Sequence, residues 1–76
     1  MIKYDAIQQY KRYGFVSADG NTLLIGSVLK KEPTKITVVI IEPLARNGEV
    51  VVMPITTVVA TATARKLMKE AHILGD

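Results

Sequence analysis

The chain contains no cysteine and only one histidine, so two common ways of stabilising a small protein are missing. A disulfide needs two cysteines, and a structural zinc site needs several cysteine or histidine ligands. A chain of 76 residues buries only a modest core and usually needs a disulfide, a metal or association with another chain. The composition therefore predicts self-association, with no metal or other cofactor. It is also compatible with a reducing cytoplasm, which is the location we expect.

Long hydrophobic runs are absent as well. The longest, residues 36–41, falls far short of the roughly 20 residues that a membrane-spanning helix requires. Near the N-terminus, Asp5, Gln8, Gln9 and Lys11 interrupt the apolar residues, so no signal peptide is expected there. We therefore expect no association with a membrane.

Groups of residues suited to catalysis are also missing. Ser17 and Ser27 have no base beside them in a recognisable pattern. His72 has no cysteine, second histidine or paired carboxylate to complete a metal site, so we expect it to be an ordinary surface residue. The sequence predicts no catalytic residue and no enzyme, because the acidic residues before the C-terminal one are scattered at positions typical of caps, turns and loops: Asp5, Asp19, Glu32, Glu42, Glu49 and Glu70.

What the chain does contain is a series of aliphatic segments separated by turn residues. Gly20 and Gly48, each beside an asparagine, allow the positive φ that tight reversals need, and a charged segment ending in Pro33 breaks the run between them. Gly26 lies inside one segment, where a glycine is typical of a bulge or sharp bend. These signals predict five strands, at about residues 14–18, 22–31, 35–43, 49–54 and 56–60.

The predicted strands are apolar on both faces. Side chains alternate along a strand, yet within residues 36–41 aliphatic residues stand at odd as well as even positions, and residues 50–53 are apolar throughout. A sheet with one face in water would alternate apolar and polar residues instead. We therefore expect the second face to be covered in part by another copy of the chain.

Helices are expected at both ends. Asp5 can cap a helix over residues 5–13, Gln8 can complete a capping box, and Gly14 can end the helix. Residues 63–74 carry apolar side chains at helical spacing, with Gly75 as the stop. The predicted fold class is mainly β: a single domain over residues 1–76, in which a small, strongly bent, five-stranded antiparallel β-barrel at about residues 14–60 is flanked by two helices.

The charge balance is mildly basic, with ten basic and seven acidic residues and a formal net charge of +3. A small positive charge favours an anionic partner but also suits ordinary solubility. The distribution is more informative, because the basic residues occur as the doublets Lys11–Arg12, Lys30–Lys31 and Arg65–Lys66. The last doublet lies near the start of the predicted second helix, where positive charge opposes the helix dipole unless an anion is nearby.

The element order, a helix, a curved meander with a glycine-bent second strand and a short fifth strand, resembles the Sm/LSm family, including its bacterial Hfq branch. Residues 19–28, Asp-Gly-Asn-Thr-Leu-Leu-Ile-Gly-Ser-Val, followed by Glu32, resemble the first Sm motif in the spacing of a turn glycine, a bend glycine and an acidic loop residue. Residues 55–59, Ile-Thr-Thr-Val-Val, resemble the end of the second motif in its Hfq form. The resemblance covers about residues 5–60 and implies a homo-oligomeric ring that binds nucleic acid, RNA more than DNA.

The chain departs from the family at the residues that hold uridine. Ile36 stands near the family's asparagine position, and Val52, Met53 and Pro54 stand where basic or histidine residues precede the second-motif isoleucine. The resemblance therefore implies binding with little sequence preference, through lysines near the ring pore that contact phosphates. The candidate residues are Lys30, Lys31, Thr34 and Lys35 in the loop between the second and third strands, with Lys11 and Arg12 as a second patch.

Residues 11–16, Lys-Arg-Tyr-Gly-Phe-Val, resemble instead the basic and aromatic motif of cold-shock domains, an OB-fold in which aromatic side chains stack on single-stranded bases. The next strand lacks a second aromatic. A helix at residues 5–13 separates the two interpretations, because an Sm-like fold requires it and a cold-shock fold forbids it. Without that helix, Tyr13 and Phe15 become the stacking residues. With it, helix and core packing accounts for all four aromatics: Tyr4, Tyr10, Tyr13 and Phe15.

A different class of function also fits the sequence. The chain can be a structural or adaptor oligomer that binds another protein through an exposed aliphatic surface. Salt separates the alternatives, because nucleic-acid binding weakens steeply as salt rises and an apolar protein contact does not.

Overall fold

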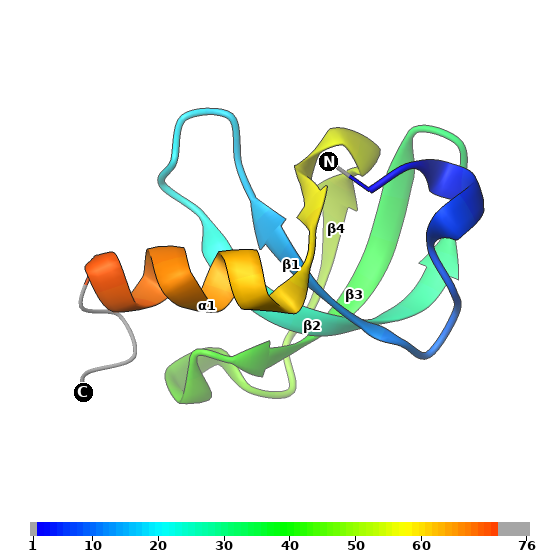
Figure 1. Cartoon of the computed structure of the whole chain (residues 1–76). Helices are drawn as coiled ribbons and strands as arrows, with labels where there is room; N and C mark the ends of the chain where they lie inside the picture. Colours follow the sequence, from blue (N-terminus) through cyan, green and yellow to red (C-terminus); the bar gives the residue numbers. More distant parts are fainter. Residues whose placement is uncertain (1, 72–76) are drawn as a thin grey trace.

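The computed structural model describes residues 2–71, which form one antiparallel sheet with a helix packed against it (Figure 1). The strand order is β4-β3-β2-β1-β5. The mainly β class with five antiparallel strands is confirmed. Within the described residues β4 and β5 are the edges of an open sheet, so closure into a barrel is not seen. The elements are η1 (Tyr4–Ala6), β1 (Arg12–Val16), β2 (Leu23–Lys31), β3 (Lys35–Glu42), η2 (Leu44–Arg46), β4 (Val50–Pro54), η3 (Ile55–Thr57), β5 (Val58–Val59) and α1 (Thr61–Glu70).

The glycines act where the sequence predicts reversals and bends. Gly20 and Gly48 have φ values of 75° and 93°, which residues with a Cβ rarely adopt. The β2–β3 register shifts between Ile25 and Gly26, as expected of a bulge, and a Cβ on Gly26 would meet the carbonyl oxygen of Val39 at 2.7 Å. Glycine therefore lets the two strands stay together at the bend.

An aspartate fixes the β1–β2 turn. The hydroxyl of Ser17 donates a hydrogen bond to the Asp19 carboxylate over 2.5 Å, and the Asn21 amide donates another over 3.0 Å. These bonds, led by the one from Ser17, lower the pKa of the Asp19 carboxyl from its ordinary value of 3.8. The carboxylate therefore stays ionised in the turn that leads into β2.

The predicted helix at residues 5–13 is wrong. Only Tyr4–Ala6 form a turn of 3-10 helix, and no side chain caps it. The core gives the reason: Tyr13 and Phe15 are both buried among the same residues, and residues two apart share a face in a strand but not in a helix. β1 therefore begins at Arg12, and Gly14 lies inside the strand.

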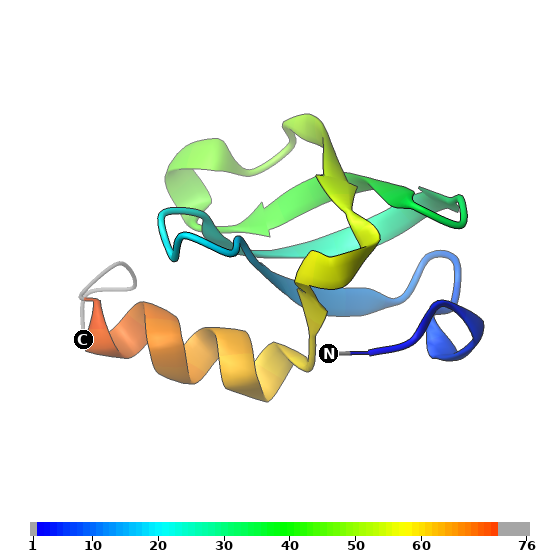
Figure 2. The same ribbon diagram turned by 90° about the horizontal axis from the view of Figure 1, so that it is seen from above.

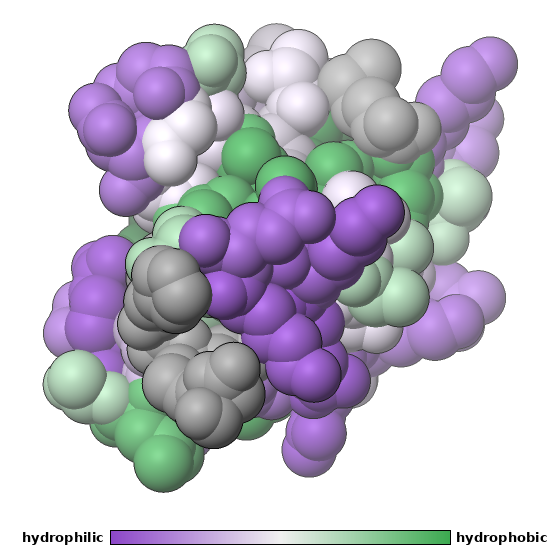
Figure 3. Space-filling view, turned by 60° about the vertical axis from the view of Figure 1, so that its left-hand side comes forward, coloured by the Kyte–Doolittle hydropathy of each residue, from purple (hydrophilic) through white to green (hydrophobic). Residues whose placement is uncertain are grey.

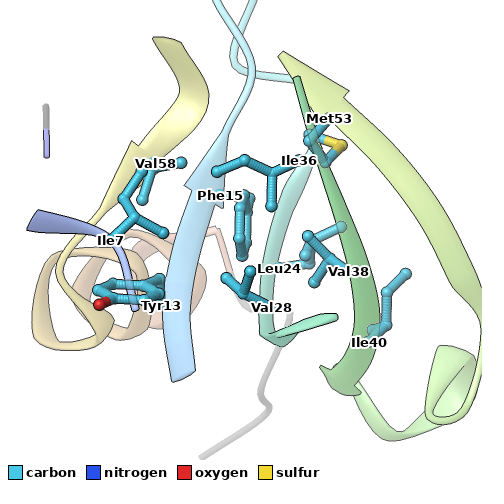
Figure 4. Packing of buried hydrophobic residues seen from close by; sticks show 10 residues of the cluster. All are labelled: Ile7, Tyr13, Phe15, Leu24, Val28, Ile36, Val38, Ile40, Met53 and Val58. Carbon is cyan, nitrogen blue, oxygen red and sulfur yellow. The ribbon is translucent and has the colours of Figure 1, made fainter. Parts of the chain in front are cut away.

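Ten buried hydrophobic side chains fill the concave side of the curled sheet (Figure 4). They come from all five strands and from the segment before β1. Because Tyr13 and Phe15 are only 5% and 0% exposed, they offer no surface to a nucleic-acid base, and the stacking role predicted for them from the cold-shock resemblance is wrong. The ten residues are Ile7, Tyr13, Phe15, Leu24, Val28, Ile36, Val38, Ile40, Met53 and Val58.

Helix α1 covers part of the other face of the sheet (Figure 2). Ala64 and Met68 pack on Ile25, forming a second, smaller buried cluster over β1 and β2. The predicted C-terminal helix is confirmed, but it begins at Thr61 and ends at Glu70, with Ala71 as its C-cap. His72 and the predicted residues after it, including the Gly75 stop, lie outside the described residues.

Gly14 is the residue on which α1 rests. A Cβ at this position would collide with the Ala64 Cβ and come within 3.1 Å of the Ala60 carbonyl oxygen. We expect Gly14→Ala to push α1 off the sheet and lower the free energy of unfolding by about 1–3 kcal/mol, the usual cost of overpacking. Urea unfolding measures the loss. Adding Ala64→Gly should restore part of it despite glycine's poor helix propensity, and no recovery would contradict this contact.

The second face of β3 and β4 remains uncovered by α1. Cross-strand pairs Thr37–Val52 and Val39–Val50 lie on it, and residues Val50 and Val52 are 60% and 58% exposed. Val51 and Met53 point into the core instead. Two-sided apolar character is thus confirmed, with α1 rather than a second copy covering the β1–β2 part.

Candidate nucleic-acid interface

Two segments that are distant in sequence lie on the same side of the molecule, opposite the end of α1. They are residues 3–12, before and at the start of β1, and residues 29–35, at the β2–β3 turn (Figures 1 and 2). We call this surface the basic end. It brings together all the site residues predicted from the sequence: Lys11, Arg12, Lys30, Lys31, Thr34 and Lys35.

Hydrogen bonds along β2 hold the two segments together. The Tyr10 amide donates to the Val28 carbonyl over 2.6 Å, and the Val28 amide donates to the Lys11 carbonyl over 3.1 Å. The Gln9 side-chain amide donates to the Leu29 carbonyl over 2.8 Å. The residues just before β1 therefore run antiparallel alongside β2. This arrangement places the Lys11–Arg12 doublet next to the strand that ends in Lys30 and Lys31.

The lysines of the β2–β3 turn do not all converge. Lys30 and Lys35 both approach the Glu32 carboxylate, at 3.4 and 3.8 Å, and all three side chains are substantially exposed. Lys31 turns to the N-terminal segment, where its ammonium donates to the Tyr4 carbonyl over 3.1 Å and lies 4.3 Å from the centre of the Tyr4 ring. Glu32 thus offsets part of the turn's positive charge. Thr34 supports the turn through its carbonyl, which accepts from the Ile55 amide over 3.0 Å.

The charge of the chain is concentrated at the basic end. Six basic and two acidic residues there give a net +4, whereas the remaining four basic and five acidic residues give −1, which together make the +3 of the whole chain. Lys11 and Arg12 are exposed and form no ion pair with any residue between 2 and 71. A concentration of net positive charge on one side attracts anions far more than the small total suggests.

One residue of this surface was missed by reasoning from the sequence. Tyr10 is 72% exposed, although core and helix packing was expected for every aromatic residue. Its φ is 67°, in the left-handed region. Nothing in the sequence indicates this conformation, since the residue is not glycine, asparagine or aspartate.

The third basic doublet has a structural partner. Arg65 donates to the Glu42 carboxylate over 2.7 Å, which ties α1 to the end of β3 and supplies the anion that its place near the helix start calls for. The space-filling view from this side of the molecule shows hydrophilic surface gathered over α1 (Figure 3). Acidic and basic residues are mixed on this helix, whose exposed charged residues are Arg65, Lys66, Lys69 and Glu70.

Of the four positions that the Sm resemblance places at a uridine pocket, two belong to the core, whereas Val52 and Pro54 are exposed. Ile36 is fully buried and Met53 is 9% exposed. The residues between 2 and 71 also enclose no pocket, and no group of three histidine, cysteine or carboxylate side chains among them could hold a metal. No helix in this part of the chain is long and apolar enough to cross a membrane. The basic end is therefore an open surface that can contact a ligand only from outside.

Comparisons with known proteins add no relative to this picture: no family model matches the chain, and neither a curated protein nor a solved structure matches it.

Proposed function

We propose that this protein binds single-stranded nucleic acid, RNA more than DNA, at the basic end, without catalysis and with low sequence specificity. The observation that carries the proposal is the concentration of a net +4 on one side of a chain whose remainder is −1. Binding follows from phosphate neutralisation and release of counterions, which needs clustered basic side chains and no pocket. Specificity is low because positive charge alone reads no base.

The basic side chains can make these contacts without rearrangement. Lys11 and Arg12 are exposed, and Lys30 and Lys35 are held only by weak surface ion pairs to Glu32. The Lys31 ammonium has three donors, and the Tyr4 carbonyl uses one of them. A strand crossing this surface therefore meets up to five of its six positive groups.

The Sm-like interpretation remains part of the proposal. Its support is the four-stranded meander, the bend of β2 at Gly26 and the short β5 after η3. The N-terminal helix that this interpretation was expected to require is absent between residues 2 and 71, and the sheet is open. The Sm-like interpretation therefore rests on the order and the bend of the strands alone. A cytoplasmic ring that binds RNA is the form this interpretation takes.

Association through β4 follows from the exposed edge of the sheet. Between residues 2 and 71, β4 is an unpaired edge strand and carries the exposed Val50 and Val52, a combination that soluble chains normally cover. A ring pairs β4 of one copy with β5 of the next, where the Val58 carbonyl already accepts a hydrogen bond from the Ile2 amide over 2.9 Å. In this ring the neighbour displaces the Ile2 contact or extends β5 beyond it.

Light scattering at micromolar concentration tests this association. We expect a mass several times 8.3 kDa for the unmodified chain. The variant Val52→Lys should instead have the monomer mass of 8.3 kDa, because a charge at this exposed position costs the monomer little stability. Lys66→Glu on α1 is the control and should leave the mass unchanged. A mass of twice 8.3 kDa would point to a two-fold dimer through β4, and 8.3 kDa for the unmodified chain would eliminate self-association.

The proposed function predicts that removing one negative charge strengthens binding. Glu32→Gln frees Lys30 and Lys35 from their shared carboxylate, so we expect tighter binding of a labelled single strand at low salt and a steeper loss of affinity as salt rises. Fluorescence anisotropy across a salt series measures both. Glu49→Gln, at an exposed ion pair with Arg46 away from the basic end, is the control. Equal gains from the two variants would contradict binding at the basic end.

An adaptor function is the second candidate, favoured by the exposure of Val50 and Val52. In this case a partner protein covers the outer face of β3 and β4, and its binding changes little with salt. If the chain binds no RNA or DNA at low salt, this candidate replaces the first.

A further inference from the structure

Tyr10 differs from the other aromatic residues of the chain. Tyr13 and Phe15 are buried in the core, and the Tyr4 ring is covered by the Lys31 ammonium at 4.3 Å. Tyr10 is 72% exposed. The structure therefore leaves one aromatic side chain mostly in water, and it belongs to the basic end.

The backbone of Tyr10 has a conformation that residues with a Cβ rarely adopt. Its φ of 67° is left-handed, and the hydrogen bond from its amide to the Val28 carbonyl holds the residue in place. Glycine would adopt this conformation without strain. Strained residues persist where the surrounding structure over-determines them, and they cluster at functional sites. Stability alone therefore does not explain a tyrosine here, whereas a use for its side chain does.

The neighbours of Tyr10 match the way proteins hold single strands. Gln8, Gln9, Lys11 and Arg12 are all exposed, and the last two have no ionic partner between residues 2 and 71. Surfaces that bind single strands combine basic groups along the backbone with aromatic rings on which bases stack. Tyr10, Lys11 and Arg12 supply both within three consecutive residues.

We propose that Tyr10 stacks on an unpaired base of a single strand whose adjacent phosphates contact Lys11 and Arg12. This inference rests on the proposed function and extends it from phosphates to a base. Stacking distinguishes single strands from duplexes, where the base faces are already occupied. It adds no sequence code, since every base has a π face.

Two matched strands test the proposal: a short oligonucleotide and an abasic strand with the same sugar–phosphate backbone, each made as RNA and as DNA. Tyr10→Ala and Tyr10→Gly should weaken binding of the base-bearing strand by about 5- to 150-fold, the range for loss of one stacked base. Tyr10→Phe should bind like the unmodified chain. All variants should bind the abasic strand equally and keep the salt slope, because no charge changes. Tyr10→Gly should also be at least as stable to urea as the unmodified protein.

A fluorescent variant gives a second readout. The chain has no tryptophan, so Tyr10→Trp introduces a single indole at an exposed position. Its emission should be quenched by the base-bearing strand and unaffected by the abasic one.

The outcomes separate the two proposals. If the unmodified chain binds both strands with equal affinity, or if Tyr10→Ala binds like the unmodified chain, stacking is overturned and phosphate binding stands. If the unmodified chain binds neither strand at low salt, the proposed function falls and the stacking role falls with it.

Discussion

Phe15→Ala should move the urea midpoint of unfolding to a much lower concentration. The side chain is fully buried at the centre of the ten-residue cluster, and removing a buried phenylalanine ring costs about 3–5 kcal/mol. A domain of 76 residues has a total stability of about 4–11 kcal/mol. The substitution therefore removes a large part of the whole, and urea unfolding followed by circular dichroism measures it.

Leu44→Ala is the matched control for this prediction. Leu44 is 84% exposed, so truncating it should change the free energy of unfolding by no more than about 0.5 kcal/mol. If both variants were equally stable, the burial of Phe15 inside the curled sheet would be contradicted.

The second large effect concerns binding. Replacing Lys11, Arg12, Lys30, Lys31 and Lys35 with glutamine should lower affinity for every single strand alike. At about 0.2–1 kcal/mol for each exposed charge pair, the five contacts contribute about 1–5 kcal/mol, roughly one to four powers of ten in Kd. The slope of log K against log salt should fall by up to about 3.5, or about 0.7 for each phosphate contact on a single strand.

The control replaces exposed basic residues on α1, away from the basic end. Lys66→Gln with Lys69→Gln lowers the net charge without touching the proposed surface, so affinity and salt slope should change little. Binding that falls with net charge wherever the charge is removed would indicate non-specific attraction and would contradict the basic end as the site.

Features with a local cause could be predicted from the sequence. Gly20 and Gly48 indicate chain reversals, and Gly26 indicates a bend, because each allows a conformation or a close approach that other residues disfavour. The helical spacing of apolar residues near the C-terminus likewise predicted α1. The orientation of β4 could not be predicted, since residues 50–53 are all apolar and only pairing with β3 makes Val50 and Val52 face outwards.

The prediction of a helix in the N-terminal segment was wrong for a related reason. Asp5 and Gln8 have the spacing of a capping box, and Ala6, Ile7, Tyr10 and Tyr13 have helical spacing, so local signals favour a helix. Tertiary packing overrides them. Burying Tyr13 with Phe15 needs a strand, and the hydrogen bonds to β2 hold Tyr10 in its left-handed conformation.

The candidate site was predicted as a set of charges but not as a geometry. The sequence identified the two basic segments, while the hydrogen bonds along β2 that bring them to one side depend on the fold. The division of the turn lysines between Glu32 and Tyr4 depends on the fold as well. The exposure of Tyr10 was not predicted, because exposure of an aromatic residue has no signature in a single sequence.

Amide chemical shifts recorded while a single strand is added test the central claim most directly. The proposal predicts that residues 8–12 and 28–35 shift progressively and that those of α1 and of β4 stay unchanged. The shifts should reverse when salt is raised. Shifts confined to the outer face of β3 and β4, or no shifts at a saturating concentration of the strand, would contradict nucleic-acid binding at the basic end.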